Sequence, residues 1–328
     1  MKPSIALIGM PRSGTTWVAK AIDSHPDVLY LHEPDTVKKI ASPIVINKRD
    51  EVQYKESIAS FMAGLANERH SRCIGKLPLF DKNYRNVLQN KLQKLAVYGQ
   101  KATEKAGLKL FEKKMPVFGE LNRSTLFWKS IESMGRATSL AANCPDSKFV
   151  ILLRHPCAIY ASVKRGLAKN KYSSSTPIYE NWGLFEELIK GEFAQKNNIT
   201  IEKLKAMSIA QRMAWRWLMF IEDTEQQTKN LANCLVIKYE DICANPTEYY
   251  EKICSFYGLS FDEQIKEYIS ETTSHSNDDF YAINKDPLVA SQKWKDELSR
   301  EEIADITAVI ENTASGKNYL NEYQGSAR

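Results

Sequence analysis

Short apolar runs alternate along this chain with longer stretches of helical periodicity. The runs near residues 4-9, 28-31, 72-77, 108-113, 148-154 and 234-239 have the length and β-branched content of buried strands. Apolar residues recur at helical spacing near residues 14-24, 54-68, 84-106, 120-142, 156-169, 202-229, 241-257 and 299-313. This alternation predicts an α/β fold, in which a mostly parallel central sheet lies between layers of helices.

A strand-to-helix turn near the amino terminus has the features of an anion site. Gly9 and Gly14 bracket four residues after an apolar strand, and a helical pattern begins at Thr15. Gly14 lets the backbone approach a ligand closely, and the amides at a helix start attract negative charge. The spacing nearly matches the GxxxxGK[ST] loop of nucleoside triphosphatases, but Thr15 replaces the phosphate-binding lysine. Arg12 supplies a permanent positive charge in the loop instead.

The segment PRSGTTW, at residues 11-17, resembles the 5'-phosphosulfate loop of the sulfotransferases, whose donor is 3'-phosphoadenosine 5'-phosphosulfate (PAPS). The resemblance implies a P-loop-like three-layer sandwich with helical insertions, formed as a single domain over residues 1-328. It also implies that the phosphosulfate is held by Arg12, Ser13, Gly14, Thr15 and Thr16, and that Trp17 belongs to the same donor-binding site. No metal is expected, because the guanidinium group can neutralise the donor oxygens.

A second strand-to-helix turn follows the apolar run KFVILL. Arg154 stands at the end of that strand, Pro156 suits the first turn of a helix, and Ser162 lies about two turns into it. Ligands of open α/β sheets bind along the carboxyl edge of the strands, so the two turns are expected to meet there. Arg154 and Ser162 resemble the 3'-phosphate site of the family. Taken alone, Arg154 would be interpreted as a surface arginine, and Ser162 as a serine that faces solvent.

Sulfuryl transfer needs a base to take a proton from the acceptor. The segment VLYLHEP, at residues 28-34, predicts a strand that delivers His32 and Glu33 to the same edge. It resembles the YxEP segment of carbohydrate sulfotransferases, whose glutamate acts as base, and the match falls on Glu33. His32 is the alternative, because imidazole titrates near neutrality and the cytosolic sulfotransferases use histidine. Side chains alternate along a strand, so only one of the two is expected to face the donor.

Three further site residues rest on weaker matches. Lys114, in KKMP, resembles a lysine-x-proline segment and is predicted to stabilise the departing oxygen, with Lys76, in GKLP, as the alternative. Tyr239, in YED, resembles the tyrosine beside the adenine, although a strand-end tyrosine with its hydroxyl in water fits equally well. Lys293, in SQKWKDELS, resembles the region that closes over the 3'-phosphate, but the glycine usual in cytosolic members is absent.

The composition agrees with this predicted function and limits the possible partners and location of the protein. The chain has 328 residues, of which 43% are hydrophobic and 26% charged, as in ordinary soluble globular proteins. The formal net charge of +5 is too diluted to indicate a nucleic-acid partner but suits an anionic donor. No secretory signal or bilayer-length run is evident, so a soluble cytoplasmic protein is expected. The six cysteines show no CxxC pair or metal-ligand spacing, which predicts reduced thiols.

The predicted function is transfer of a sulfuryl group from PAPS to an acceptor hydroxyl, leaving adenosine 3',5'-bisphosphate (PAP). A carbohydrate or glycoconjugate is the favoured acceptor, though a small molecule fits the same motifs. Residues 40-106 and 170-230 match no motif and are expected to shape the acceptor pocket. Two alternatives stay open. One is a small-molecule kinase with a degenerate P-loop, which the missing lysine and the lack of a clear magnesium-holding aspartate disfavour. The other is a nucleotide-binding protein without catalysis.

Overall fold

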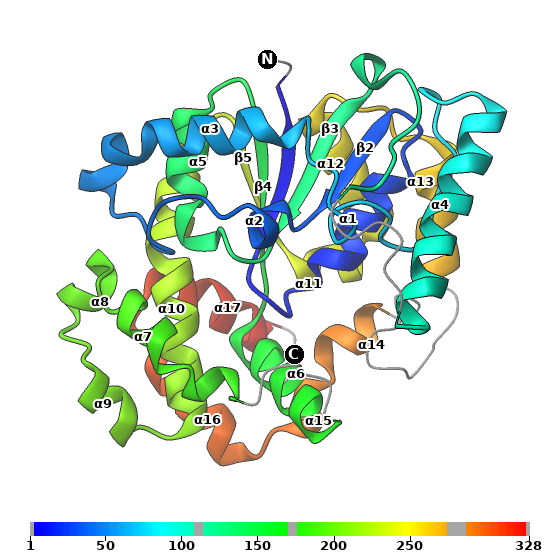
Figure 1. The fold of residues 1–328 in the computed structure, drawn as a ribbon. Coiled ribbons are helices and arrows are strands. Elements are labelled where there is room, and N and C mark those ends of the chain that lie inside the picture. Colours follow the sequence, from blue (N-terminus) through cyan, green and yellow to red (C-terminus); the bar gives the residue numbers. More distant parts are fainter. Residues whose placement is uncertain (1–2, 108–113, 170–175, 274–286, 326–328) are drawn as a thin grey trace.

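The central element of the computed structural model is a five-stranded parallel sheet with helices on both faces (Figure 1). The structure describes residues 3–107, 114–169, 176–273 and 287–325. The strands are β1 (Ile5–Gly9), β2 (Val28–His32), β3 (Thr125–Ser130), β4 (Lys148–Leu153) and β5 (Cys234–Lys238). Their order across the sheet is β2-β3-β1-β4-β5, and every neighbouring pair is parallel. The α/β sandwich predicted from the sequence is confirmed.

The continuous apolar runs of the strands follow from burial on both faces of the sheet. All five residues of β1 are buried, between β3 on one side and β4 on the other. Ile5 and Leu7 point into one apolar core, whereas Ala6 and Ile8 point into the other. A strand buried on both sides has no polar face, so its sequence does not alternate.

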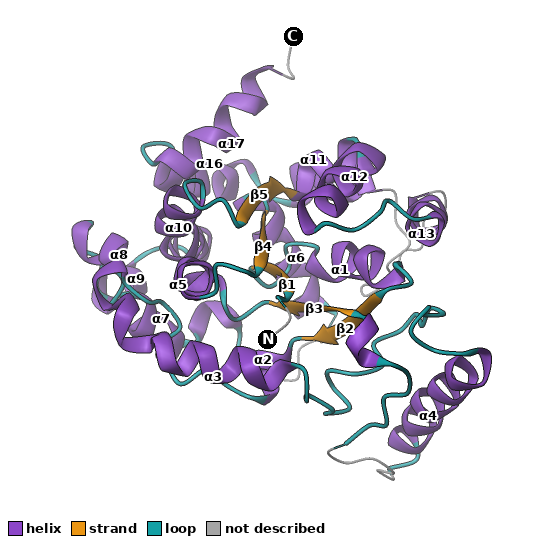
Figure 2. Ribbon diagram, turned by 90° about the horizontal axis from the view of Figure 1, so that it is seen from above, coloured by secondary structure: helices purple, strands orange, loops and turns teal. Residues whose placement is uncertain are grey.

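Each core is closed by its own group of helices (Figure 2). The first face is covered by α1 (Thr15–Ser24), α11 (Tyr239–Ala244), α12 (Pro246–Tyr257) and α13 (Glu263–Thr273). The second face carries α3 (Lys55–Leu65), α5 (Ala137–Asn143), α6 (Pro156–Ala168), α7 (Trp182–Leu188), α8 (Glu192–Lys196), α9 (Ile201–Ala206), α10 (Ile209–Thr228), α15 (Trp294–Glu297), α16 (Arg300–Ile310) and α17 (Ala314–Gly325). Shorter connections are α2 (Pro34–Val37), α14 (Pro287–Gln292), and the 3-10 turns η1 (Lys48–Tyr54), η2 (Leu121–Arg123), η3 (Met134–Arg136) and η4 (Ile178–Glu180).

Two predicted elements are wrong. Residues 72-77 form turns and not a strand, because Gly75 has a φ of 84°, outside the β region. The helix predicted over residues 120-142 is replaced by β3 and then α5. The predicted strand near residues 108-113 lies outside the described residues. Two other predicted helices each divide in two, at the Ser208 cap before α10 and at Pro246, which begins α12.

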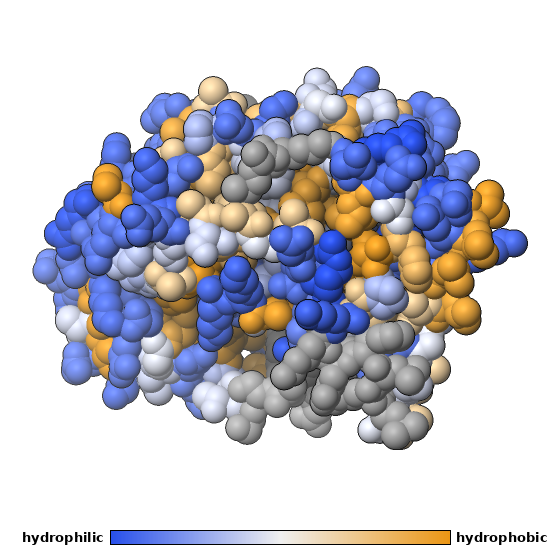
Figure 3. All heavy atoms as spheres, turned by 45° about the horizontal axis from the view of Figure 1, so that its top comes forward, coloured by the Kyte–Doolittle hydropathy of each residue, from blue (hydrophilic) through white to orange (hydrophobic). Residues whose placement is uncertain are grey.

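The edge strand β2 is covered by a separate segment of the chain. The amide of His32 donates to the carbonyl of Cys73 at 2.9 Å, and the amide of Asn83 donates to the carbonyl of Pro26 at 2.9 Å. The chain then enters α4 (Val87–Lys105), which runs beside β2 toward the carboxyl ends of the strands (Figure 1). The outward side of α4 exposes apolar side chains, visible at the right of Figure 3, from Val87, Leu88, Leu92, Leu95 and Tyr98.

Candidate active site

The loop between β1 and α1 presents unpartnered polar groups. Gly14 has a φ of 81°, which glycine tolerates. The amides of Gly14, Thr15 and Thr16 donate to no other residue in the described part of the chain. The hydroxyl of Ser13 is buried and also lacks a partner among the described residues. Buried donors of this kind are normally satisfied, so the loop is organised to receive an anion.

The second turn, after β4, is in direct contact with the first. The Nη1 atom of Arg154 donates to the carbonyl of Arg12 at 2.7 Å, and the Nε atom of Arg12 donates to the Ser162 hydroxyl at 2.9 Å. Arg154 and Ser162 are both buried, and the Nε atom of Arg154 has no partner in the described residues. The two turns, which the sequence placed at one sheet edge, therefore meet as expected.

Tyr239 lies between the two turns. Its ring is 4.5 Å from the guanidinium carbon of Arg154, a cation–π distance. The ring also packs on Gly14, because a Cβ atom added there would lie 2.2 Å from the Tyr239 Cε2 atom. Tyr239 is buried, so the alternative of a tyrosine with its hydroxyl in water does not apply. Burial raises the pKa of Tyr239 well above its ordinary value and keeps the hydroxyl protonated.

Replacing Gly14 by alanine is expected to lower the free energy of unfolding by about 1–3 kcal/mol. The new methyl group would collide with Tyr239, and φ would stay at 81°. Gly99→Ala on α4 is the matched control, because a Cβ there meets no atom within 4 Å. That control should be neutral or stabilising by up to about 1 kcal/mol. Urea unfolding of both variants measures these changes in the free energy of unfolding. Equal stability of Gly14→Ala and wild type would contradict the packing argument.

A glutamate and a lysine meet at the carboxyl ends of β2 and β3. Glu33 follows β2 with φ 49° and ψ 53°, a left-handed conformation that costs a non-glycine residue about 1 kcal/mol or more. Lys129, near the end of β3, forms an ion pair with the Glu33 carboxylate. Its Nζ atom also lies 3.3 Å from the Thr16 hydroxyl in the loop after β1. Burial lowers the pKa of Lys129, and Glu33 opposes that shift.

His32 is neutral in this setting. Burial, with the charges of Lys129 and other lysines, lowers the pKa of His32 to about 2. Its Nδ1 atom is 2.8 Å from the Tyr30 hydroxyl, and its Nε2 atom is 3.6 Å from the Glu33 carboxylate. Strict alternation would separate His32 from Glu33, but the strand ends at His32. The left-handed turn at Glu33 then brings both side chains to one place.

The remaining predicted residues occupy different positions around this centre. Lys114 is exposed and forms no hydrogen bond or ion pair with the residues above within the described chain, so its role stays a prediction. Lys76 lies near enough to Glu33 for the carboxylate to oppose the lowering of the Lys76 pKa by partial burial. Lys293 precedes α15, close to α14, whose Ala290 carbonyl lies 3.5 Å from Arg154 Nη2.

Sequence reasoning missed Lys129, which the structure brings to the site. The segment TLFWKS was joined to the helical pattern that follows it, so its lysine was not placed at a strand end. The sequence nevertheless contains a feature that indicates this position of Lys129. A single lysine closing a short run of aromatic and aliphatic residues is typical of a charged side chain carried to the carboxyl edge by a buried strand.

Two other polar residues near the turns have structural partners. His155, at the N-cap of α6, accepts a hydrogen bond from the Cys157 amide at 3.2 Å and stacks on Trp294 with ring centroids 4.5 Å apart. An aspartate at this position would accept the same hydrogen bond from the helix start. His155 therefore serves as the N-cap in its place. The Glu240 carboxylate accepts from the His155 amide at 3.0 Å and so fixes the turn after β4.

The fold and the two contacting turns define an α/β protein of the P-loop type. A family model described as "Sulfotransferase family" matches residues 3–263, so the chain belongs to the sulfotransferase family, whose members transfer sulfuryl groups. No curated protein matches the chain in a sequence search. Among the described residues, no group of three or more His, Cys, Asp or Glu side chains is arranged for a metal ion. None of the described helices has both the length and the apolar character needed to cross a bilayer.

Several solved sulfotransferase structures are similar in fold. A mouse sulfotransferase, SULT7A1, in complex with PAP has 14% identity and a TM-score of 0.44, covering 98% of this chain and 89% of that one. The sulfotransferase domain of the Synechococcus PCC 7002 olefin synthase has 14% identity and a TM-score of 0.40, covering 93% and 94%. A sulfotransferase from Alicyclobacillus acidocaldarius has 14% identity and a TM-score of 0.36, covering 90% and 99%.

Proposed function

We propose that this sulfotransferase uses PAPS as donor and transfers its sulfuryl group to an acceptor hydroxyl, with a carbohydrate or glycoconjugate as the favoured acceptor. The observation that carries the proposal is the contact between the two turns. Arg154, Tyr239 and Gly14 lie against one another, so a cation and an aromatic ring stand beside the anion loop. A nucleotide with phosphate groups at both its 5' and 3' positions requires such a pair of sites.

The residues present fit this donor. The free amides of Gly14, Thr15 and Thr16 and the unpartnered hydroxyl of Ser13 would hold the phosphosulfate, with Arg12 supplying charge. The 3'-phosphate would take the unpartnered Nε–H of Arg154 and the Ser162 hydroxyl, with Lys293 as a further contact. Tyr239 and Trp17, whose ring centroids are 6.0 Å apart, would border the base. When bound, the donor supplies an activated sulfuryl group on a phosphate leaving group.

The chain's own residues would supply proton transfer and charge stabilisation. Glu33 accepts the proton of the acceptor hydroxyl, whose oxygen forms the new bond to sulfur as the bond to the departing phosphate oxygen breaks. Lys129, between Glu33 and Thr16, stabilises the charge that grows on that oxygen. His32 positions the base, because the protonated Tyr30 hydroxyl can donate to its Nδ1 atom and leave the Nε2 proton facing Glu33.

A calorimetric comparison tests the donor. PAP is expected to bind at least tenfold more tightly than ATP with magnesium, and Arg154→Met should lower PAP affinity by about 10- to 100-fold, toward that of AMP. A preference for ATP with magnesium would favour the kinase alternative. Tight binding of PAP without transfer from PAPS to any member of a broad acceptor panel would favour the non-catalytic alternative.

A further inference from the structure

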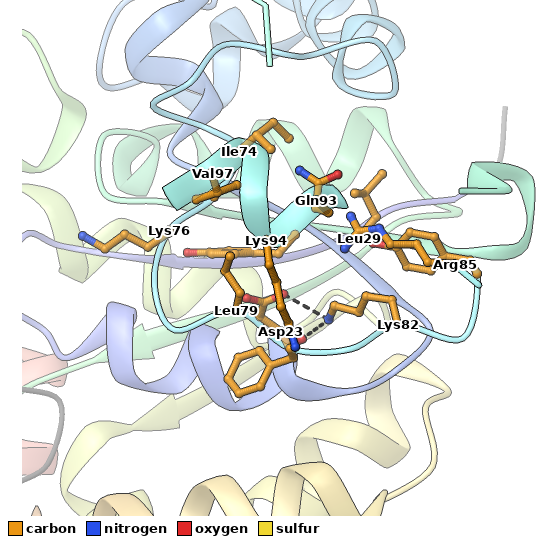
Figure 4. A pocket seen from close by; sticks show the side chains of 14 residues that line it. Asp23, Leu29, Ile74, Lys76, Leu79, Lys82, Arg85, Gln93, Lys94 and Val97 are labelled. Carbon is orange, nitrogen blue, oxygen red and sulfur yellow. Dashed lines mark hydrogen bonds and ion pairs between the residues drawn. The ribbon is translucent and has the colours of Figure 1, made fainter. Parts of the chain in front are cut away.

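A basic pocket lies beside the proposed base, between the edge strand β2 and α4 (Figure 4). The empty space between its lining residues amounts to about 480 Å³, which includes open solvent. Four positive side chains and one negative one line it, together with three aromatic rings. The positive side chains are those of Lys76, Lys82, Arg85 and Lys94, and the negative one is that of Asp23. The pocket is connected to the active site through Tyr30, whose hydroxyl contacts His32.

Most charges of this basic pocket are already paired. Asp23 forms ion pairs with the buried Lys20 and, at 3.2 Å, with Lys82, which Figure 4 shows turned toward it. Lys94 pairs with Asp81 at 2.8 Å. These paired groups therefore stabilise the walls of the pocket. A ligand could bind one of them only by breaking its ion pair. Lys76 differs, because it extends away from the paired group in Figure 4.

A second lysine lies next to Lys76. Val97 packs on Gly75, since a Cβ atom there would lie 2.7 Å from a Val97 methyl carbon. Lys101 follows Val97 by one helical turn on the same side of α4, toward the carboxyl edge of the sheet. The charge of Lys101 lowers the pKa of both Lys76 and His32, after the larger effect of burial. Lys76 and Lys101 thus lie close enough for their charges to act on each other and on His32.

Within the described part of the chain, neither of these two lysines has a counterion. Lys76 and Lys101 form no side-chain hydrogen bond or ion pair with any described residue. Two carboxylates of this region have other partners: Glu33 pairs with Lys129, and Glu104, on α4, accepts from Gln100 at 2.8 Å. Two like charges close to each other repel, and an anion bound between them would offset that repulsion.

We propose that Lys76 and Lys101 bind a fixed negative charge on the acceptor, so that the acceptor is an anionic molecule, with a carboxylate, sulfate or phosphate group near the reacting hydroxyl. This inference rests on the proposed function, because it places the reacting hydroxyl at Glu33. Phe80, the half-buried ring of the basic pocket, would contact an apolar face of the same molecule.

Matched acceptors test this proposal. We would measure sulfuryl transfer from labelled PAPS to methyl β-glucoside, methyl β-glucuronide and methyl β-glucoside 6-phosphate, and their binding to the PAP complex by calorimetry. At least one charged compound is expected to exceed the neutral one tenfold in kcat/KM or affinity. Lys76→Gln and Lys101→Gln should each remove about tenfold of that preference and leave the affinity for PAP unchanged. Lys91→Gln is the control, because Lys91 lies on the exposed side of the same helix and should behave as wild type.

The other possible results separate a failure of the proposed function from a failure of the anionic acceptor. A protein that does not bind PAP contradicts the proposed function itself. A protein that binds PAP but prefers the neutral sugar, binds neither charged sugar, or keeps its preference in both variants overturns only the anionic acceptor. Loss of PAP affinity in Lys76→Gln or Lys101→Gln would also overturn it, because the lysines would then serve the donor.

Discussion

Glu33→Gln is expected to lower kcat by about 10²- to 10⁴-fold while PAP affinity stays within about threefold of wild type. The amide keeps the shape of the carboxylate but cannot accept the acceptor proton. Glu33, which directly follows β2, is also held in a left-handed conformation with φ 49°. Strain of this kind persists where the surrounding structure fixes a functional side chain. Single-turnover transfer from PAPS and calorimetry with PAP give the two quantities.

His32→Gln is the matched control for the choice of base. With a pKa lowered to about 2 by burial and neighbouring lysines, the imidazole stays neutral across the working pH range. Its Nδ1 atom is also occupied by Tyr30. His32→Gln should therefore cost about tenfold or less, and the pH profile of kcat should show no step near the ordinary histidine pKa of about 6.5. A loss equal to that of Glu33→Gln would make His32 the base.

The sequence was informative where the chemistry is local. The turn after β1 carries its glycines, hydroxyls and arginine within eight consecutive residues, and the turn after β4 carries Arg154 and Ser162 within nine, from the end of the strand into the following helix. Both turns rest on buried strands whose apolar runs are unambiguous, because those strands lie inside the sheet. The parallel order of the strands then places the two turns at one edge, as the contacts of Arg154 with Arg12 show.

The sequence was uninformative where the site depends on distant contacts or on backbone geometry. Residues 125–130 read as part of a helix because they are short and are followed directly by helical periodicity, so Lys129 was not found. The meeting of His32 and Glu33 depends on one left-handed residue, which no pattern of side chains reveals. Lys76 and Lys101 are 25 residues apart, and only the packing of Val97 on Gly75 brings them together.

Lys129→Met is expected to lower kcat by about 10²- to 10³-fold, because one preorganised charge is removed from the oxygen that departs. Methionine keeps the length of the buried side chain without its ammonium group. The pH dependence should change as well. Burial lowers the pKa of Lys129, so its charge is lost as pH rises through a value below the ordinary lysine range of about 10.4. The wild-type rate should fall along that alkaline limb, and the residual rate of Lys129→Met should lack it.

Structural damage and catalytic loss can be separated in this variant. Removing Lys129 leaves the Glu33 carboxylate without its ion-pair partner, so the single variant is expected to be less stable than wild type. Combining it with Glu33→Gln removes the unpaired charge and should recover part of that stability without recovering the rate. In kcat the two substitutions should be far from additive, because the base and the cation act on the same transfer. Full activity in Lys129→Met, or an alkaline limb that persists in it, would show that another cation stabilises the departing oxygen, and Lys114→Met would then be the variant to compare.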